Sequence, residues 1–280
     1  MAVTVIAELG ANHNGSTFTA TEMVGAAQKA GADFVKFQKR DVDLAIPEEQ
    51  KGVLKETPWG TYTYLEYRRF LEFGEDEFDH MQRVCDSIKM PIFSSVWDIP
   101  SAEFMLKYDM PYVKIPSAKI TDLDLLRWVA AHYSCPSIIS TGMSTMEEIH
   151  AAIRILPDAI ILHCNSTYPA PNEELNLWVI ETLRQEFPGN LIGYSGHERG
   201  IAPSVAAVAL GARMVERHLT LDRSSWGTDQ AASLEPTGFA RLVKDIRVVE
   251  ASMGDGVKRV YPGEEEARKK LRGERKVEIQ

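Results

Sequence analysis

Two histidines in the C-terminal third of the chain each follow a short apolar run that is typical of a β-strand. His197 lies in GYSGHERG and His218 in VERHLTLD. If both strands belong to one parallel series, their carboxyl ends meet at the same opening, and two neutral imidazoles held there can chelate a divalent cation. A lone histidine at a strand end is more often a hydrogen-bonded core residue. Two at matching positions, flanked by carboxylates and hydroxyls, favour a metal site.

Lysines and hydroxyl side chains follow other predicted strands. Lys36 and Lys114 can neutralise a phosphate or carboxylate while serine hydroxyls donate directional hydrogen bonds, so we expect a small anionic substrate. Either lysine alone can instead extend to solvent, and a strand-end serine is commonly a turn residue; the prediction depends on their occurring together. The polar residues expected at the opening are Glu8, Lys36, Gln38, Ser94, Ser95, Lys114, Ser117, Ser140, Thr141, Asn165, Ser166, Tyr168, Ser195, His197, Glu216 and His218.

Three carboxylates are candidates for proton transfer or for orienting a reacting hydroxyl. Glu8 follows the first predicted strand, and Glu216 precedes His218 by two residues, which places both side chains on the same strand face. Asp229, in WGTDQAASLEP, can reach back over the opening. As an alternative, each acid at a strand end can simply cap the next helix.

The elements that must position these residues alternate regularly along the chain. Apolar runs with β-branched residues alternate with segments whose apolar residues recur every three or four positions, which predicts strands alternating with helices. The predicted strands are 4–9, 34–38, 92–95, 112–115, 137–141, 160–165, 191–195 and 214–219. The predicted helices include 20–30, 78–89, 123–132, 146–156, 175–187, 201–210 and 237–252.

This order predicts an α/β protein with a parallel sheet, and eight repeats without reversal are best accommodated by a (β/α)8 TIM barrel. An open doubly wound sheet is the alternative. Residues 39–74, which include TPWGTYTYLEY, interrupt the alternation. We interpret this segment as a flap over the substrate, or equally as a surface excursion packed by its own aromatic residues. Residues 1–255 are expected to form one barrel domain, and residues 256–280 a charged tail or linker stub.

Composition restricts the class of protein. The chain has 280 residues, 44% of them hydrophobic and 25% charged, and a formal net charge of −9, so a nucleic-acid or anionic-membrane partner is not expected. The start of the chain lacks the pattern of a signal peptide, and no run approaches the roughly 20 apolar residues of a membrane span, which favours a cytoplasmic location. The three cysteines, Cys85, Cys135 and Cys164, form no CxxC pair and are interpreted as buried thiols.

The motifs AELGANHNG, FVKFQ, KIPSA, ISTGMS, HCNSTYPAP, GYSGHE, VAAVALGA, ERHLTLD and GTDQAASLEP occur in this order over nearly the whole chain. Together they resemble the sialic acid synthase (N-acetylneuraminate synthase) family. The resemblance implies a TIM-barrel transferase that condenses phosphoenolpyruvate with an open-chain aldose, usually N-acetylmannosamine, to a 3-deoxy-2-ulosonic acid and phosphate. It also implies a divalent metal, Mn²⁺ or Mg²⁺, and a homodimer.

The resemblance assigns the residues by position. His197 and His218 match the metal ligands. The positions that bind phosphoenolpyruvate correspond to Lys36, Ser95, Lys114, Ser117, Ser140, Ser166 and Ser195. The positions near the acceptor sugar or the water shell of the metal correspond to Glu8, Gln38, Tyr168, Glu216 and Asp229. We expect Glu8, Lys36, Lys114 and His218 to be catalytic.

This chain departs from the family pattern in several places. Ser95 and Ser166 replace a Thr or Asn of several members, which keeps a polar group. Family members usually continue into a small antifreeze-like domain that supplies an arginine to the partner's site, and this sequence stops before it, which leaves the acceptor open. Lys119 is also unusual, and either contacts an acidic or phosphorylated acceptor or is a solvated loop lysine.

Three functions remain open at this stage. One is the metal-dependent condensing synthase, acting on N-acetylmannosamine or on a different aldose. A second is a Schiff-base pyruvate aldolase with Lys36 or Lys114 as the nucleophile. The third is a non-catalytic barrel that binds a sugar.

Overall fold

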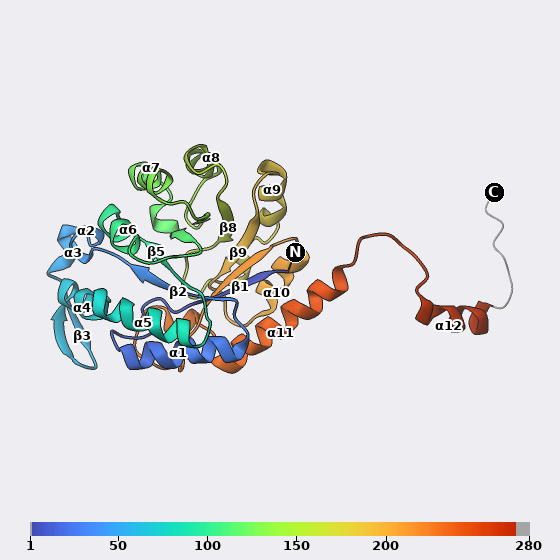
Figure 1. Cartoon of the computed structure of the whole chain (residues 1–280), viewed down its shortest axis with the longest axis horizontal. Coiled ribbons are helices and arrows are strands. Elements are labelled where there is room, and N and C mark those ends of the chain that lie inside the picture. The colour runs from blue at the N-terminus through green and yellow to red at the C-terminus, as the bar shows by residue number, and fades with distance from the viewer. Residues whose placement is uncertain (1, 273–280) are drawn as a thin grey trace.

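Eight parallel strands close into a barrel in the order β1-β10-β9-β8-β7-β6-β5-β2, in a computed structural model that describes residues 2–272. The predicted (β/α)8 barrel is confirmed, and every boundary of the eight barrel strands lies within one residue of its predicted position. The barrel strands are β1 (Thr4–Glu8), β2 (Phe34–Lys39), β5 (Ile92–Val96), β6 (Val113–Ile115), β7 (Ser137–Ser140), β8 (Ile160–Cys164), β9 (Ile192–Gly196) and β10 (Met214–His218). Figure 1 shows these strands at the centre of the fold.

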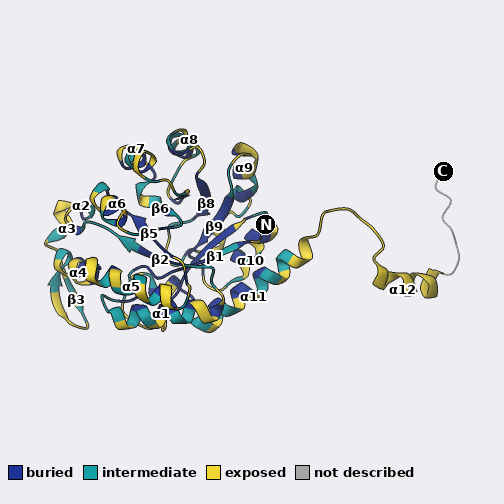
Figure 2. Ribbon diagram, in the orientation of Figure 1, coloured by how far each residue is buried: buried dark blue, intermediate teal, exposed yellow. Residues whose placement is uncertain are grey.

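Eight helices surround the strands, and Figure 2 shows the buried strands inside this outer layer. They are α1 (Thr17–Ala30), α5 (Glu75–Ser87), α6 (Ile99–Met105), α7 (Leu123–His132), α8 (Met146–Ile155), α9 (Val179–Glu186), α10 (Ala202–Ala209) and α11 (Pro236–Met253). The sequence prediction included no helix corresponding to α6, whose 7 residues are too few for a clear apolar period. The side chain of Asp98 caps it by accepting from the Ser101 amide.

One predicted helix begins later than expected. The segment 175–187 was expected to be helical throughout, but α9 starts only at Val179. A 3-10 turn over Asn172–Glu174 precedes it, and Asn176 adopts a φ of 42°, a left-handed conformation that an α-helix cannot contain.

The interruption between β2 and α5 has structure of its own. It contains α2 (Val42–Ala45), α3 (Glu48–Lys51), an antiparallel hairpin of β3 (Leu54–Thr57) and β4 (Gly60–Thr63), and α4 (Tyr64–Leu71). Phe70 packs against Trp59 at 5.3 Å and against Tyr62 at 6.5 Å between ring centroids. The interpretation as an excursion packed by its own aromatic residues is therefore confirmed, and its role as a substrate flap stays a prediction.

The C-terminal segment lies apart from the barrel. After α11 an exposed stretch leads to α12 (Pro262–Arg272), which Figure 1 shows extending away from the strands and whose residues are all exposed. The charged tail or linker stub expected over residues 256–280 stays a prediction; its described part contains this exposed helix, and residues 273–280 are outside the described residues. Within residues 2–272, no helix combines the length and apolarity needed to cross a bilayer.

The three cysteines are free thiols. Cys85 and Cys164 are buried as predicted, but Cys135 is only partly buried, so the prediction was wrong for that residue. Cys135 lies in the short connection between α7 and β7, where the chain runs along the surface of the barrel.

Candidate active site

The carboxyl ends of the barrel strands surround a cavity of about 180 Å³. With one exception, Asp229, the cavity is lined by every residue that the family resemblance assigned to substrate, metal or catalysis: Glu8, Lys36, Gln38, Ser95, Lys114, Ser117, Ser140, Ser166, Tyr168, Ser195, His197, Glu216 and His218. The strand series therefore brings these side chains together as expected.

Three polar residues that were expected at the opening do not line the cavity. The hydroxyl of Ser94 donates to the carbonyl of the next residue, and that of Thr141 donates to the Leu162 carbonyl at 3.1 Å. The Asn165 amide donates to the Glu174 carbonyl at 3.1 Å. Ser94 directly precedes Ser95 and Thr141 directly follows Ser140, and both of these neighbours line the cavity. Because successive strand residues point to opposite sides, Ser94 and Thr141 face away from the cavity, and the prediction was wrong for them.

Two buried ammonium groups dominate one side of the cavity. The Nζ of Lys36 contacts the Glu8 carboxylate and donates to the Ser95 hydroxyl at 2.6 Å. The Nζ of Lys114 donates to the Ser140 hydroxyl at 2.6 Å. Burial lowers the pKa of Lys114, so its charge depends on nearby anions. An anionic ligand placed between these groups would receive two charges and two hydroxyl donors at once.

Glu216 lies between the two lysines. Its carboxylate is 3.8 Å from the Nζ of Lys36 and 3.9 Å from that of Lys114, and it accepts from the Ser195 hydroxyl at 3.2 Å. Burial alone would raise the pKa of Glu216, but the two ammonium groups outweigh it and lower the pKa to about 2. Glu216 is therefore a fixed negative charge. Glu8 differs, because burial raises its pKa more than Lys36 lowers it, which suits a group that exchanges protons.

The backbone of Gly142 lies close to two serine side chains that line the cavity, Ser117 and Ser166. The amide of Gly142 donates to the Ser117 hydroxyl at 3.1 Å. A β-carbon at Gly142 would lie 2.1 Å from the Ser166 hydroxyl and 2.9 Å from the Ser117 hydroxyl. Glycine is thus required here for the two serines to approach the backbone at the end of β7.

The two histidines lie side by side, with ring centroids 5.4 Å apart. The Nδ1 of His197 is 2.6 Å from the Asn165 carbonyl, which fixes the ring and leaves Nε2 free to bind a metal. Burial lowers the pKa of His218 to about 3, so its ring is neutral as a ligand must be. Burial also opposes protonation of His197, but the Cys164 Sγ at 3.6 Å, the Asn165 carbonyl and Glu216 together outweigh it and raise the pKa of His197.

The two neighbouring imidazoles are the groups that would hold a divalent cation. The Nδ1 of His218 is buried without a hydrogen-bond partner, 3.9 Å from the Asp229 carboxylate, which is the kind of unsatisfied nitrogen that a metal ligand presents. Among residues 2–272 no group of three or more His, Cys, Asp or Glu is arranged to hold a metal ion.

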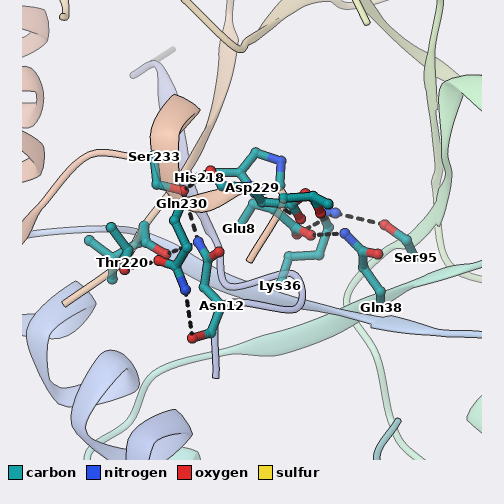
Figure 3. Close-up of polar contacts among 12 residues, drawn as sticks. Glu8, Asn12, Lys36, Gln38, Ser95, His218, Thr220, Asp229, Gln230 and Ser233 are labelled. Carbon is teal, nitrogen blue, oxygen red and sulfur yellow. Dashed lines mark hydrogen bonds and ion pairs between the residues drawn. The ribbon is translucent and has the colours of Figure 1, made fainter. Parts of the chain in front are cut away.

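Asp229 is held beside the cavity by a hydrogen-bonded network between the ends of β1 and β10, drawn in Figure 3. The Asn12 amide donates to the Ser233 hydroxyl at 2.8 Å, and that hydroxyl donates to the backbone carbonyl of Asp229 at 2.7 Å. Gln230 contacts the hydroxyl of Thr220. The motifs AELGANHNG and GTDQAASLEP are thus partly structural, since they join two distant segments of the chain.

A second buried network lies behind the histidines. Arg217 donates through Nη1 to the Glu198 carboxylate at 2.9 Å and to the Ser204 hydroxyl at 2.9 Å. The Tyr194 hydroxyl donates to the same carboxylate at 2.9 Å. A β-carbon at Gly196 would lie 2.5 Å from this carboxylate, which explains the glycine of GYSGHE.

Sequence patterns did not identify several residues at this opening. Trp97 and Cys164 line the cavity, and the Arg40 guanidinium lies over the Trp97 ring at 4.3 Å. Cys164 lies in the motif HCNSTYPAP but was interpreted only as a buried thiol, and Trp97 and Arg40 belong to no motif. Trp97 directly follows β5 and Arg40 directly follows β2, and this position after a strand is the signal that could have identified them. Lys119, in contrast, does not line the cavity and faces Asp122 at 3.7 Å.

The chain was compared with known proteins. The NeuB family matches residues 23–258. The N-acetylneuraminate-9-phosphate synthase of Homo sapiens is 38% identical over 273 residues, which are 95% of this chain and 76% of that protein. The N,N'-diacetyllegionaminic acid synthase of Legionella pneumophila is 35% identical over 266 residues, 91% of this chain and 74% of that protein.

Solved structures agree with these sequence matches. A crystal structure of N-acetylneuraminic acid (sialic acid) synthetase from Leptospira borgpetersenii serovar Hardjo-bovis in complex with citrate has a TM-score of 0.86 at 30% identity, covering 97% of this chain and 93% of that one. A truncated 3-deoxy-D-arabino-heptulosonate 7-phosphate synthase from Thermotoga maritima has a TM-score of 0.68 at 16% identity, covers 92% of this chain and 90% of that one, and shows the same fold. The chain therefore belongs to the NeuB family of synthases, which condense phosphoenolpyruvate with a sugar.

Proposed function

We propose that this protein is a sialic acid synthase-like transferase that condenses phosphoenolpyruvate with N-acetylmannosamine or a related open-chain aldose. The products are a 3-deoxy-2-ulosonic acid and phosphate, and a divalent metal, Mn²⁺ or Mg²⁺, is required. The observation that carries the proposal is the cavity itself, where the ammonium groups of Lys36 and Lys114 face the imidazoles of His197 and His218. An enol phosphate and a carbonyl can meet between them.

Phosphoenolpyruvate binds on the lysine side. Lys36 and Lys114 neutralise its phosphate and carboxylate, while hydroxyls donate to its oxygens. The hydroxyls that serve this purpose belong to Ser95, Ser117, Ser140, Ser166 and Ser195. Glu216 lies within 4 Å of both ammonium groups and balances part of their charge before the substrate arrives.

The acceptor binds on the histidine side. A divalent metal held by His197 and His218 would polarise the carbonyl of the aldose as a Lewis acid. Tyr168 packs over the His197 ring with 4.0 Å between centroids, and it forms an apolar wall against which a sugar can lie. Gln38 and Asp229 supply polar contacts to its hydroxyls.

The chemical steps then follow from the positions of these groups. C3 of phosphoenolpyruvate attacks the carbonyl carbon, and the new alkoxide takes up a proton. The positive charge that develops at C2 is met by a water molecule, which Glu8 positions or deprotonates to leave a hydroxyl on C2. The resulting hemiketal phosphate expels inorganic phosphate by cleavage of its C–O bond.

A screen of aldoses, measuring phosphate released from phosphoenolpyruvate, tests the proposal. Phosphoenolpyruvate labelled with ¹⁸O at the bridging position should deliver the label to phosphate, because the C–O bond breaks. Absence of release with every aldose would reject the synthase. Borohydride trapping of pyruvate on Lys36 or Lys114 would favour the Schiff-base aldolase, whereas binding of a sugar without any turnover would favour a non-catalytic barrel.

The same family resemblance supports two further proposals, a homodimer and a cytoplasmic location. Light scattering on the purified chain measures the first. A monomer at micromolar concentration would contradict it.

A further inference from the structure

Two charged residues next to the histidines are buried outside the cavity. Arg217 lies between Glu216 and His218, which both line the cavity, and successive strand residues point to opposite sides, so the Arg217 side chain faces away from it. Glu198 directly follows His197 and does not line the cavity either. Neither side chain of this pair is exposed to solvent. The mechanism described above uses neither of them.

Tyr194, Glu198, Ser204 and Arg217 form one hydrogen-bonded group, which we call the Glu198 network. The Oε1 of Glu198 accepts from Arg217 at 2.9 Å and from the Ser204 hydroxyl at 2.7 Å, and its Oε2 accepts from the Tyr194 hydroxyl at 2.9 Å. Arg217 also donates to the backbone carbonyls of Glu198, at 2.6 Å, and Gly200, at 2.8 Å. Both carboxylate oxygens are thus satisfied, as a buried charge requires.

The network holds the backbone on both sides of His197. Gly196, directly before it, pairs with Arg217 between β9 and β10, and a β-carbon at Gly196 would lie 2.9 Å from the Cδ of Arg217. Glu198, directly after it, accepts from Arg217 through both its carboxylate and its carbonyl. Arg217 itself directly precedes His218. One side chain therefore joins the segment that carries one imidazole to the segment that carries the other.

Stability alone does not explain a buried ion pair at this place. Taking two charges out of water costs free energy that their attraction repays only in part, and apolar side chains of similar volume often stabilise a fold as well or better. A fully satisfied polar network instead provides rigidity, because each hydrogen bond restricts a distance and an angle. Here the network restricts the end of β9 relative to the end of β10.

Two imidazoles can share a cation only over a narrow range of separations. The rings of His197 and His218 are 5.4 Å apart between centroids. Distances between a metal and its ligands tolerate deviations of only about 0.2 Å. A relative movement of the two strand ends by more than about 0.5 Å would therefore weaken one of the two bonds to the metal.

We propose that Glu198 and Arg217 are positioning residues, which fix the separation of His197 and His218 and thereby set the affinity of the site for a divalent cation. The inference rests on the proposed function for the metal itself. Both residues lie outside the cavity, so they act on the cation only through the histidines. Their substitution should therefore change metal affinity and not only the stability of the fold.

Calorimetric titration of the whole chain with Mn²⁺ tests the proposal. Glu198→Gln keeps the shape of the side chain and removes its charge, and Arg217→Lys keeps the charge but cannot donate to the carboxylate and two carbonyls at once. Each should weaken Mn²⁺ binding roughly 10- to 100-fold. Ser204→Ala removes only a neutral hydroxyl and should weaken it about 3-fold or more, which covers the case that the charge variants do not fold.

Leu126→Ala is the matched control for lost stability. Leu126 is fully buried on α7, which follows β6 on the other side of the barrel from β9 and β10, and its truncation destabilises the fold by creating a cavity. Its melting temperature should fall while Mn²⁺ affinity stays that of the wild type. Wild-type affinity in the folded network variants, or an equal loss in Leu126→Ala, would overturn the proposal.

A double variant distinguishes one shared network from two separate defects. Glu198→Gln combined with Arg217→Lys should weaken Mn²⁺ binding about as much as the more severe single variant, because both changes break the same contacts. A loss equal to the product of the two single losses would contradict a shared network.

The wild-type titration separates this proposal from the proposed function. If the wild-type protein binds neither Mn²⁺ nor Mg²⁺, the metal requirement of the synthase is rejected, and the positioning role is rejected with it. If the wild type binds Mn²⁺ and every network variant binds it equally well, only the positioning role is rejected.

Discussion

Arg217 and Glu198 form an ion pair of 2.9 Å in which neither side chain is exposed to solvent. Arg217 directly precedes His218, and Glu198 directly follows His197, so the pair joins the ends of β9 and β10 on the side opposite the cavity. Arg217 also donates to the carbonyls of Glu198 and Gly200. The spacing of the two imidazoles therefore depends on a contact that neither of them makes.

Removing one partner of this pair should destabilise the fold strongly. Arg217→Ala leaves the Glu198 carboxylate buried without a counter-charge, which costs about 3–5 kcal/mol of unfolding free energy. Urea denaturation measures this loss of unfolding free energy. Arg241→Ala is the comparison, since Arg241 is 69% exposed in its pair with Asp245 and should cost less than about 1 kcal/mol. A loss below 1 kcal/mol in Arg217→Ala would show that the pair is not important for stability.

Replacing His218 should remove metal binding and turnover together. His218→Ala deletes one of the two imidazoles, so we expect roughly a 100-fold or greater loss of metal affinity, measured by calorimetry with Mn²⁺, with a parallel loss of phosphate release. His132→Ala is the control, because that ring is exposed and stacks on Trp128. Normal Mn²⁺ affinity in folded His218→Ala would contradict the assignment.

Chelation should stop the reaction reversibly. Dialysis against EDTA is expected to abolish phosphate release from phosphoenolpyruvate, and Mn²⁺ should restore it. Release is measured with a coupled phosphate assay, and dialysis against the same buffer without chelator serves as a control. Undiminished turnover in EDTA would exclude a metal requirement.

A substitution at Gly142 tests whether Ser117 and Ser166 bind phosphoenolpyruvate. Gly142→Ala places a methyl group against the hydroxyls of Ser117 and Ser166, so the KM for phosphoenolpyruvate should rise about 10-fold or more through lost charge-assisted hydrogen bonds. Gly25→Ala is the control, since nothing lies within 4 Å of its β-carbon position. If the KM stays unchanged in Gly142→Ala, these hydroxyls do not bind the substrate.

His13 should make stability depend on pH. The residue is 5% exposed, and burial lowers its pKa from 6.5 to about 4. The unfolded chain therefore takes up a proton that the folded protein does not, so the contribution is complete above pH 6.5 and is lost as the pH falls toward 4, about 3 kcal/mol in total. Urea denaturation at several pH values measures this slope.

A variant of His13 shows how much of the change in unfolding free energy with pH comes from this residue. His13→Asn keeps an acceptor near the Gly15 amide and should be less sensitive to pH between 6.5 and 4 than the wild type. His132→Asn, at an exposed position, should retain the wild-type dependence. Equal slopes in all three proteins would show that His13 does not contribute.

The sequence predicted most of the cavity because its residues follow a repeating rule. His197, His218 and Lys114 lie within two residues of a strand end, and alternation along a strand decides which side chains face inward. The same rule explains the failures, since Ser94 and Thr141 occupy the alternate positions. α6 was missed because 7 residues do not establish a helical period.

Other parts of the site follow no such rule. Arg40 lies over the Trp97 ring, and its pairing with Glu72, which directly follows α4, depends on how the segment between β2 and α5 folds back on the barrel. No periodicity in residues 39–74 encodes that path. The partial burial of Arg40 and the unpaired Trp97 indole likewise become visible only when tertiary packing is known.

The two halves of the site differ in how they are built into the chain. The lysines and serines that are proposed to bind the enol phosphate project from the barrel strands or the turns that directly follow them, whereas Arg40 belongs to the insert between β2 and α5. The hairpin of that insert is a separate sheet that shares no strand pairing with the barrel. Grafting inserts between relatives is therefore a way to alter one edge of the cavity while the strand pairing that places the lysines and histidines is kept.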